Sequence, residues 1–265
     1  MPFIELEEGR RLFYEARGEG RPVVLVHGWS ASHVLWRESV DELAPLCRTI
    51  AYDQRGHGRS SACDGPFTMA AYARDLGELL ERLDLRDVVL VGWSMGAVVA
   101  LELFRRPARA RVGKLVLLSG SPRLTKASGW PHGFDLAELR GLRLAMAADR
   151  IATTRAFLGA LMGASHRDAM IDLVTGVAME VPLAAAVESF QSELEADLRG
   201  VLEDIDVPTL IVHGDEDHPV CLGASEFMLA QLRRGERVQL PSCGHFGPLE
   251  APVALSGVLG RFVGR

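Results

Sequence analysis

The sequence is poor in lysine and contains no long hydrophobic run. Lys114 and Lys126 are the only lysines among its 29 basic residues, and the net charge is −6. No basic stripe is present that could neutralise phosphates, so we do not expect nucleic acid as a partner. No apolar segment is long enough to cross a bilayer, and residues 1–8 lack the apolar core of a signal peptide. These absences predict a cytoplasmic protein that does not bind membranes.

Cysteine is also scarce, and its spacing is not that of a metal site. The four cysteines are scattered along the chain, at Cys47, Cys63, Cys221 and Cys243. We expect them to be free thiols. Carboxylates and imidazoles crowd one short segment that contains His213, Asp215, Asp217 and His218. Because side chains so close along one turn do not offer a tetrahedral ligand geometry, we expect no metal there and no other cofactor.

Short apolar runs alternate with helical patterns over much of the chain. The runs are continuous rather than alternating, as in strands buried on both faces of a parallel sheet, and cover residues 23–26, 88–91, 115–118 and 210–212. Helical periodicity at residues 69–83 and 95–106 separates them. This order predicts an α/β fold with a mostly parallel twisted sheet flanked by helices, and a site at the carboxyl ends of the strands.

The alternation of strands and helices is interrupted between Ser121 and about Asp206. This segment has helical periodicity at residues 136–146, 151–162 and 167–179, and no convincing strand. Such an insertion between two strands is most simply a helical cap over the site. We therefore predict a core formed by residues 1–122 and 207–265, with residues 123–206 as the inserted cap.

One strand runs directly into the pattern Gly-x-Ser-x-Gly at residues 92–96, and a helical run follows at once. This context is typical of a nucleophile elbow, where Ser94 sits on a strained turn with its hydroxyl exposed. Gly92 and Gly96 are expected because side chains there would collide with the neighbouring strand and helix. The amides and the partial positive charge of the helix N-terminus would favour an oxyanion beside Ser94.

A serine nucleophile needs a histidine base, and chain order selects one of the eight histidines. In folds that carry such an elbow, the acid and then the histidine follow the serine. His245 meets this condition, since it lies in a loop after the strand-like residues 237–240. We expect it to reach across the top of the sheet to Ser94.

The acid that orients His245 is expected just after residues 210–212, where three carboxylates compete. We favour Asp217, because the turn after the strand allows its side chain to point at His245. Asp215 is expected to bind backbone amides of the turn instead. The choice between these two aspartates stays open at this stage.

Two backbone amides are needed to hold an oxyanion. One belongs to Met95, directly after the nucleophile, and the other is expected from Trp29, in the loop after the first parallel strand. The indole of Trp29 is also expected to form one wall of the pocket.

Together these motifs resemble the α/β-hydrolase superfamily. They are His27-Gly28-Trp29, Asp53-x-Arg55-Gly56-x-Gly58-x-Ser60, Gly92-x-Ser94-x-Gly96, Gly214-x-x-Asp217 and Gly244-His245. Within it, the chain is similar to the pimeloyl-[acyl-carrier protein] methyl ester esterase (BioH) family, through its Gly92-Trp93-Ser94 elbow and residues 119–133 and 157–163. The resemblance implies an esterase of biotin synthesis whose substrate contacts are Trp29, Ser94, Met95, Phe157, Leu158, Gly159, Ala160, Leu161 and His245. Met95 stands where leucine is common in that family, and Ala152 and Ala156 stand where basic residues are expected.

The expected activity is hydrolysis of a carboxylic ester through an acyl-enzyme, with the methyl ester of pimeloyl-acyl-carrier protein as the favoured substrate. The alternatives are a general carboxylesterase or lactonase, a cofactor-free perhydrolase, and a ligand receptor of the same fold with slow turnover. Apolar residues of the predicted cap are expected to line an acyl channel or to attach the cap to the sheet; they are Leu142, Met146, Phe157, Leu161 and Met162.

Basic residues outnumber acidic ones by six to three between residues 123 and 155. This excess could attract an acidic acyl-carrier protein, although an ordinary solvated helix face would show the same pattern. The six are Arg123, Lys126, Arg140, Arg143, Arg150 and Arg155.

Overall fold

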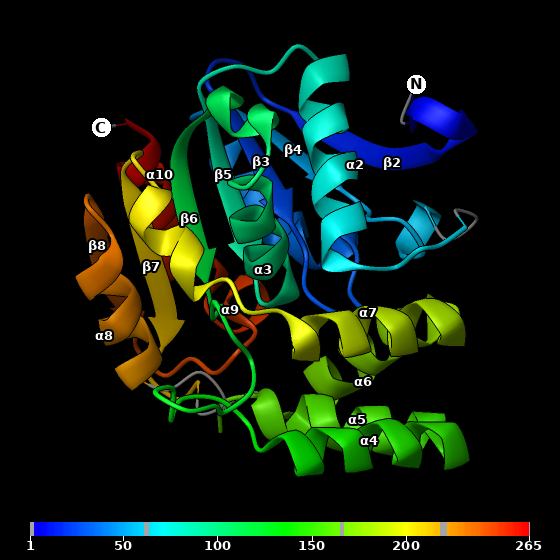
Figure 1. The fold of residues 1–265 in the computed structure, drawn as a ribbon. Coiled ribbons are helices and arrows are strands. Elements are labelled where there is room, and N and C mark those ends of the chain that lie inside the picture. Colours follow the sequence, from blue (N-terminus) through cyan, green and yellow to red (C-terminus); the bar gives the residue numbers. More distant parts are fainter. Residues whose placement is uncertain (1–2, 61–63, 165–166, 218–221, 265) are drawn as a thin grey trace.

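The computed structural model describes residues 3–60, 64–164, 167–217 and 222–264. Its centre is an eight-stranded sheet with the order β1-β2-β4-β3-β5-β6-β7-β8 (Figure 1). The pairs β1/β2 and β2/β4 are antiparallel, and all the others are parallel. The strands are β1 (Phe3–Glu5), β2 (Arg11–Arg17), β3 (Pro22–Val26), β4 (Arg48–Tyr52), β5 (Val88–Trp93), β6 (Val112–Leu118), β7 (Thr209–Gly214) and β8 (Gly235–Leu240).

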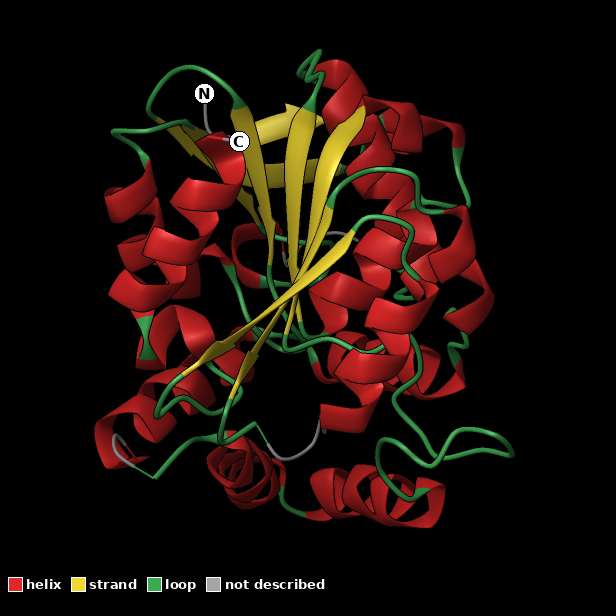
Figure 2. Cartoon of the chain, turned by 90° about the vertical axis from the view of Figure 1, so that its left-hand side faces the viewer, coloured by secondary structure: helices red, strands yellow, loops and turns green. Residues whose placement is uncertain are grey.

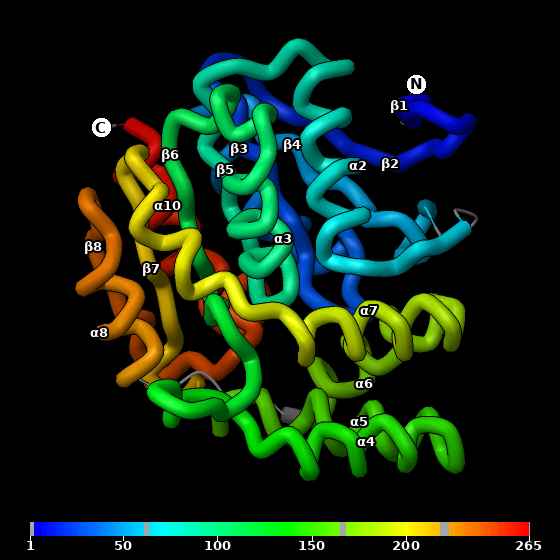
Figure 3. Tube along the Cα trace, viewed as in Figure 1, coloured from blue at the N-terminus to red at the C-terminus, as the bar shows by residue number. Residues whose placement is uncertain are grey.

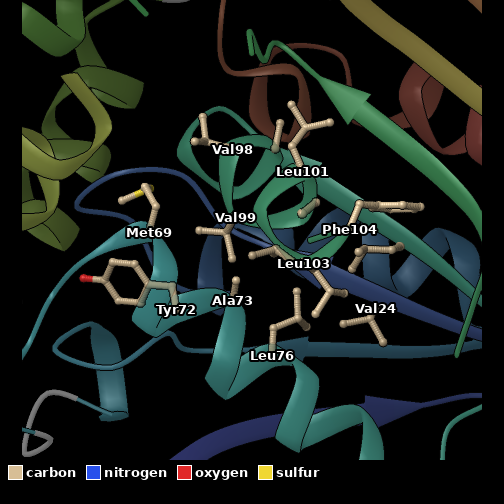
Figure 4. Close-up of a cluster of buried hydrophobic side chains, with 14 of the residues drawn as sticks. Val24, Met69, Tyr72, Ala73, Leu76, Val98, Val99, Leu101, Leu103 and Phe104 are labelled. Carbon is tan, nitrogen blue, oxygen red and sulfur yellow. The ribbon is translucent and has the colours of Figure 1, made fainter. Parts of the chain in front are cut away.

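Helices cover both faces of this sheet (Figure 2). The flanking helices are α1 (Arg37–Leu43), α2 (Met69–Arg82), α3 (Met95–Leu103), α8 (Leu222–Gln231), α9 (Gly247–Glu250) and α10 (Pro252–Gly264). Alternate residues of β3 pack against opposite layers: Val24 joins the cluster under α2 and α3, whereas Val23 joins the cluster under α1 and α10. Figure 4 shows the first of these clusters, in which side chains of α2 and α3 meet around Val24. The continuous apolar runs therefore correspond to strands buried on both faces, as predicted.

The chain between β6 and β7 forms the helices α4 (Leu136–Ala148), α5 (Arg150–Leu161), α6 (Arg167–Glu180) and α7 (Leu183–Glu195). Aspartates begin the first two: Asp135 accepts a hydrogen bond from the amide of Ala137, and Asp149 accepts one from Ala152. These helices lie across the carboxyl ends of the parallel strands, while both ends of the chain lie at the opposite end of the molecule (Figure 3). The elements fall where the cap was predicted, and the division into core and cap stays a prediction.

In the described part of the chain, no single helix is long and apolar enough to cross a membrane. The pair α6 and α7 passes that test only when taken together, and the two helices are bent by 103° at their junction. Both helices contribute buried side chains to the protein interior, among them Val174 of α6 and Phe190 of α7.

Candidate active site

Ser94 lies at the sharp turn between β5 and α3 with a backbone conformation that side chains rarely adopt, φ 56° and ψ −121°. The turn is possible because its neighbours are glycines. A Cβ atom at Gly92 would lie 2.3 Å from the carbonyl oxygen of Gly96, and one at Gly96 would lie 2.3 Å from that of Val26. The strain is offset by the surrounding core and by a 2.9 Å hydrogen bond from the Ser94 amide to Leu118.

Three side chains from distant parts of the sequence form a continuous hydrogen-bonded chain. His245 Nε2 lies 2.8 Å from Ser94 Oγ, and His245 Nδ1 lies 3.0 Å from Asp217 Oδ1. Ser94 follows β5, Asp217 follows β7 and His245 follows β8, so each extends from the carboxyl end of a strand. Such a chain can withdraw a proton from the serine hydroxyl.

Asp217 and Asp215 have different surroundings. Asp217 is buried, and its second oxygen lies 3.6 Å from Nδ1 of His213. Asp215 is exposed, and its carboxylate accepts a 3.1 Å hydrogen bond from the amide of Cys243. The aspartate that meets the histidine is thus the one favoured from the sequence, and the other binds a backbone amide.

Asp217 and His245 each favour the charged form of the other. Burial by itself would raise the pKa of Asp217, but the charge and hydrogen bond of His245, together with the nearby imidazole of His213, lower it well below its usual range. Burial by itself would lower the pKa of His245, but the charge and hydrogen bond of Asp217 raise it above 6.5. An imidazolium formed at His245 is therefore stabilised.

The loop that carries His245 is held by two residues whose role the sequence did not indicate. Trp93, beside the nucleophile, donates a 2.8 Å hydrogen bond from its indole to the carbonyl of His245. Glu250 accepts hydrogen bonds from the amides of Gly244, Phe246 and Gly163, the last of which lies beyond α5. Glu250 thus joins the histidine loop to the helical segment above it, an arrangement for which no sequence motif exists.

The expected oxyanion donors lie beside Ser94. Gly28 is so close that a Cβ atom there would lie 3.1 Å from that of Ser94. Among the described residues, the amides of Trp29 and Met95 donate no backbone hydrogen bond outside regular elements, and their role as oxyanion donors stays a prediction. The indole of Trp29 donates a 2.8 Å hydrogen bond to the carbonyl of Ala186 in α7, and this fixes its ring as a wall of the cavity.

A cavity of about 50 Å³ lies over Ser94, with room for a few water molecules. Its lining is mostly apolar and includes Phe157, Leu158 and Leu161 of the predicted contacts. Gly159 instead faces Ile171, and Ala160 lines a second hollow of about 290 Å³ farther out on the cap.

Three of the residues predicted for an acyl channel do not line this cavity in the described part of the chain. Leu142 and Met146 pack in a cluster with Phe190, and Met162 packs in the core. They attach the cap instead, because the helical pattern identifies an apolar face but not what that face meets. The lining residues that the sequence analysis missed include Phe134, Phe190 and Glu193.

Three of the six basic residues predicted to attract a carrier protein bind other groups of this protein. Arg123 pairs with Asp197 at 2.8 Å, and Arg155 pairs with Asp172 at 2.7 Å. Arg150 donates hydrogen bonds to carbonyls at the end of α6. Lys126 and Arg140 are exposed and Arg143 is half-buried. The excess of positive charge offered to a partner is therefore smaller than the sequence suggests.

Two of the four cysteines, Cys63 and Cys221, lie outside the described residues. The same is true of His218, which the sequence analysis considered as a metal ligand. The two described cysteines, Cys47 and Cys243, are free and buried. Burial raises the pKa of Cys243 to about 12, which makes this thiol a poor nucleophile although it lies near Asp217.

The profile of a known family, described as the alpha/beta hydrolase fold, matches residues 21–252. The chain belongs to the α/β-hydrolase family. This membership, together with the sheet order and the flanking helices, confirms the fold class and the resemblance stated from the motifs. By its family and its relatives this α/β-hydrolase is a hydrolytic enzyme.

The relatives of this α/β-hydrolase include haloperoxidases and methyl ester esterases. It is 32% identical to a non-heme haloperoxidase of Rhodococcus erythropolis over 92% of this chain and 93% of that protein. It is 30% identical to a pimeloyl-[acyl-carrier protein] methyl ester esterase of Nitrosospira multiformis over 95% and 97%. Among solved structures, an esterase from Exiguobacterium antarcticum superposes with a TM-score of 0.94 at 26% identity, and 99% of each chain is covered.

Proposed function

We propose that this α/β-hydrolase cleaves carboxylic esters through an acyl-enzyme formed on Ser94. The observation that carries the proposal is the hydrogen-bonded chain from Ser94 through His245 to Asp217, with separations of 2.8 and 3.0 Å. The esterases among its relatives and structural neighbours support the same chemistry.

In the first half of the reaction, His245 Nε2 takes the proton of Ser94 as Oγ attacks the ester carbonyl. The negative charge that develops on the carbonyl oxygen is held by the amides of Trp29 and Met95. His245 then gives its proton to the departing alcohol, and the acyl group stays on Ser94.

In the second half, a water molecule replaces the alcohol and the same groups act in reverse. His245 takes a proton from the water, which attacks the acyl carbon, and returns it to Ser94 as the acid leaves. Asp217 keeps the imidazole in the required tautomer and stabilises its charged form throughout.

The apolar lining of the cavity favours an ester with an apolar acyl part, because it offers few polar groups. The methyl ester of pimeloyl-acyl-carrier protein is the specific substrate that we propose, on the ground of the relatives with that activity in their names. Lys126, Arg140 and Arg143 are then the cap residues that would face the acidic carrier protein, since the other basic residues are engaged internally.

The experiment is to incubate the protein with pimeloyl-acyl-carrier protein methyl ester and follow the loss of the methyl group by intact mass. Ser94→Ala is the blank, with an expected loss of about a million-fold in turnover. Rapid Ser94-dependent release supports the specific substrate. Release only from short soluble esters supports a general carboxylesterase or lactonase, and turnover far below one per second on every ester supports a slow receptor.

A second candidate is perhydrolysis, favoured by the haloperoxidases among the relatives. Hydrogen peroxide would take the place of water, give its proton to His245 and accept the acyl group from Ser94, so that a peracid is released. Halide oxidation by that peracid needs both a carboxylic acid or ester and peroxide. Bromination of monochlorodimedone that depends on acetate, peroxide and Ser94 would establish this activity, and its absence would leave hydrolysis alone.

A further inference from the structure

Glu193 of α7 brings a carboxyl group into the cavity that contains Ser94 and His245. Its side chain belongs to a residue that is only 5% exposed. Aromatic rings surround this part of α7: Phe190 lies one turn earlier, with its ring centre 5.2 Å from that of Trp29 and 6.1 Å from that of Phe157. An acidic group is therefore placed in apolar surroundings beside the reacting atoms.

The carboxyl group of Glu193 has no hydrogen-bond or ion-pair partner among the described residues, in contrast to its neighbours on α7. Glu188 accepts a hydrogen bond from the amide of Phe67, and Glu195 accepts one from the side chain of Gln191. The two carboxyl oxygens of Glu193 are not among the enclosed side-chain atoms that lack a partner, so they are open to the cavity that this residue lines. Because polar groups inside proteins are nearly always hydrogen-bonded, a ligand in this cavity can supply the missing partner.

The groups of the triad do not need Glu193. Ser94 already has His245 as its partner, and His245 has Asp217. Since the hydroxyl, the base and the orienting acid are all paired, the carboxyl group of Glu193 is available to the part of the substrate that does not react.

The charge state of Glu193 is set near neutrality by its surroundings. Burial raises the pKa of Glu193 to about 7, and the positive charge of His245 opposes the rise. His245 is the only other titratable side chain among the described residues that line the cavity, with Asp217 and Glu250 acting on it from behind. From α2, which packs against α7, Tyr72 faces Glu188 as an uncharged phenol whose pKa is raised by burial.

We propose that Glu193 selects esters that carry a second, uncharged oxygen acceptor, such as another ester or carbonyl group, by donating a hydrogen bond to it from its protonated carboxyl group. In its ionised form the same residue disfavours substrates with a negative charge at that position. This inference rests on the proposed esterase function and specifies the substrate class of the same cavity.

Three substrates with the same seven-carbon chain test it. Methyl heptanoate ends in a methyl group, dimethyl pimelate ends in a second neutral ester, and monomethyl pimelate ends in a carboxylate. We expect wild-type kcat/KM at pH 6, counted per ester end, to be about three- to tenfold higher for dimethyl pimelate than for methyl heptanoate, as one hydrogen bond supplies. The difference should lie mainly in KM, because the bond is present in both ground and transition states.

The pH dependence of the substrate preference, measured in wild type and three variants, separates substrate selection by Glu193 from a purely structural role. The preference of the wild type for dimethyl pimelate should fall as the pH rises through about 7, and monomethyl pimelate should become the poorest substrate. Glu193→Gln keeps a donor without an ionisable group, so its preference should not change with pH. Glu193→Leu should lose the preference, and Glu195→Gln, on the exposed side of the same helix, should behave as wild type. Equal preference in the wild type and Glu193→Leu would overturn the inference.

A binding measurement tests the role of Glu193 without relying on ester cleavage. Ser94→Ala should bind dimethyl pimelate at pH 8 with uptake of a proton, detected by calorimetry in buffers of different ionisation enthalpy, and adding Glu193→Gln should abolish the uptake. Proton uptake without cleavage of any ester by wild type would reject the esterase proposal and keep the role of Glu193. Cleavage of esters without proton uptake and without an effect of Glu193→Leu would keep the esterase proposal and reject the role of Glu193. Absence of both binding and cleavage would overturn both proposals.

Discussion

Asp217 and Glu193 are both buried carboxyl groups close to His245, yet their surroundings move their pKa values in opposite directions. Asp217 lies beside the imidazoles of His245 and His213, and the hydrogen bond of His245 and the charges of both overcome its burial and lower its pKa. Glu193 lines a mostly apolar cavity, and burial raises its pKa to about 7. One carboxyl group therefore stays charged while the other takes up a proton near neutrality, a difference typical of groups with separate roles in one site.

Asp217→Asn should lower kcat by about 10⁴-fold, because the imidazole loses both its orienting partner and the charge that stabilises its protonated form. The base must be neutral to act, so activity rises with pH through the pKa of His245, which Asp217 raises above 6.5. We expect the acid limb of kcat/KM in wild type to lie above pH 6.5, and the residual activity of Asp217→Asn to have its limb at lower pH. Asp215→Asn is the matched control, and a larger loss there would mean that the aspartates are wrongly assigned.

Glu193→Gln should stabilise the fold at alkaline pH. The pKa of Glu193 in the folded protein, about 7, is above its ordinary value of 4.5. Stability from this group is therefore fully present below pH 4.5 and is lost as the pH rises through 7. We expect urea unfolding to show the variant gaining on the order of 1–3 kcal/mol relative to wild type between pH 5 and pH 8. An equal difference between variant and wild type at both pH values would contradict this.

At the scale of elements, the loops after β5, β7 and β8 depend on one another. The indole of Trp93 holds the backbone of His245, and Glu250 at the end of α9 binds amides on both sides of that histidine. The third amide bound by Glu250, that of Gly163, belongs to the segment after α5. The position of the base is thus coupled to the position of the cap.

Glu250→Ala should lower kcat about 10- to 100-fold with little change in KM, because three amides lose their acceptor and His245 loses its fixed position. The acid limb of the pH profile should also move to lower pH, since the charge of Glu250 contributes to the raised pKa of His245. Glu216→Ala is the control: it removes only the 2.6 Å bond from the amide of Ala164 to Glu216. Equal effects of the two variants on steady-state kinetics would show that Glu250 does not position the base.

At the scale of the whole molecule, the helices between β6 and β7 lie across the carboxyl ends of the parallel strands (Figure 3). Phe134, Phe157 and Leu161 line both the cavity of about 50 Å³ over Ser94 and the hollow of about 290 Å³. We expect these helices to move when an ester reaches Ser94, while the sheet stays in place.

Hydrogen exchange followed by mass spectrometry should show that the cap helices open more readily than the sheet. All of β5 is buried, whereas Leu139 and Met146 are the only buried residues of α4. We expect the amides of α4 to exchange at least about 100-fold faster than those of β5, because fewer apolar contacts are broken when α4 opens. Binding of an ester to Ser94→Ala should slow exchange in the cap, and equal rates in the two elements would contradict the model of a moving cap.

The particular residues show which features a sequence can predict. Ser94 and its glycines were predictable because the elbow is a local motif, and the buried strands because apolar runs depend only on neighbours in the chain. Glu193 and Glu250 were not, because neither belongs to a motif. Glu193 lines a cavity with Ser94 and His245, which are far away in sequence, and Glu250 joins the histidine loop to the distant Gly163. For Leu142, Met146 and Met162 the choice between lining the cavity and attaching the cap stayed open for a related reason: a helical pattern shows that a face is apolar but not which surface covers it.

The sequence by itself determined the alternation of strands and helices, the family, the candidate nucleophile and base, and the place of the helical insertion, since all of these depend on local patterns and their order. Only the tertiary structure decided which aspartate meets His245, which cations are already paired, and which side chains enclose the cavity. The reason is physical: hydrogen bonds, ion pairs and burial act between neighbours in space, and the fold brings those neighbours together from β5, β7, β8 and the helices of the insertion.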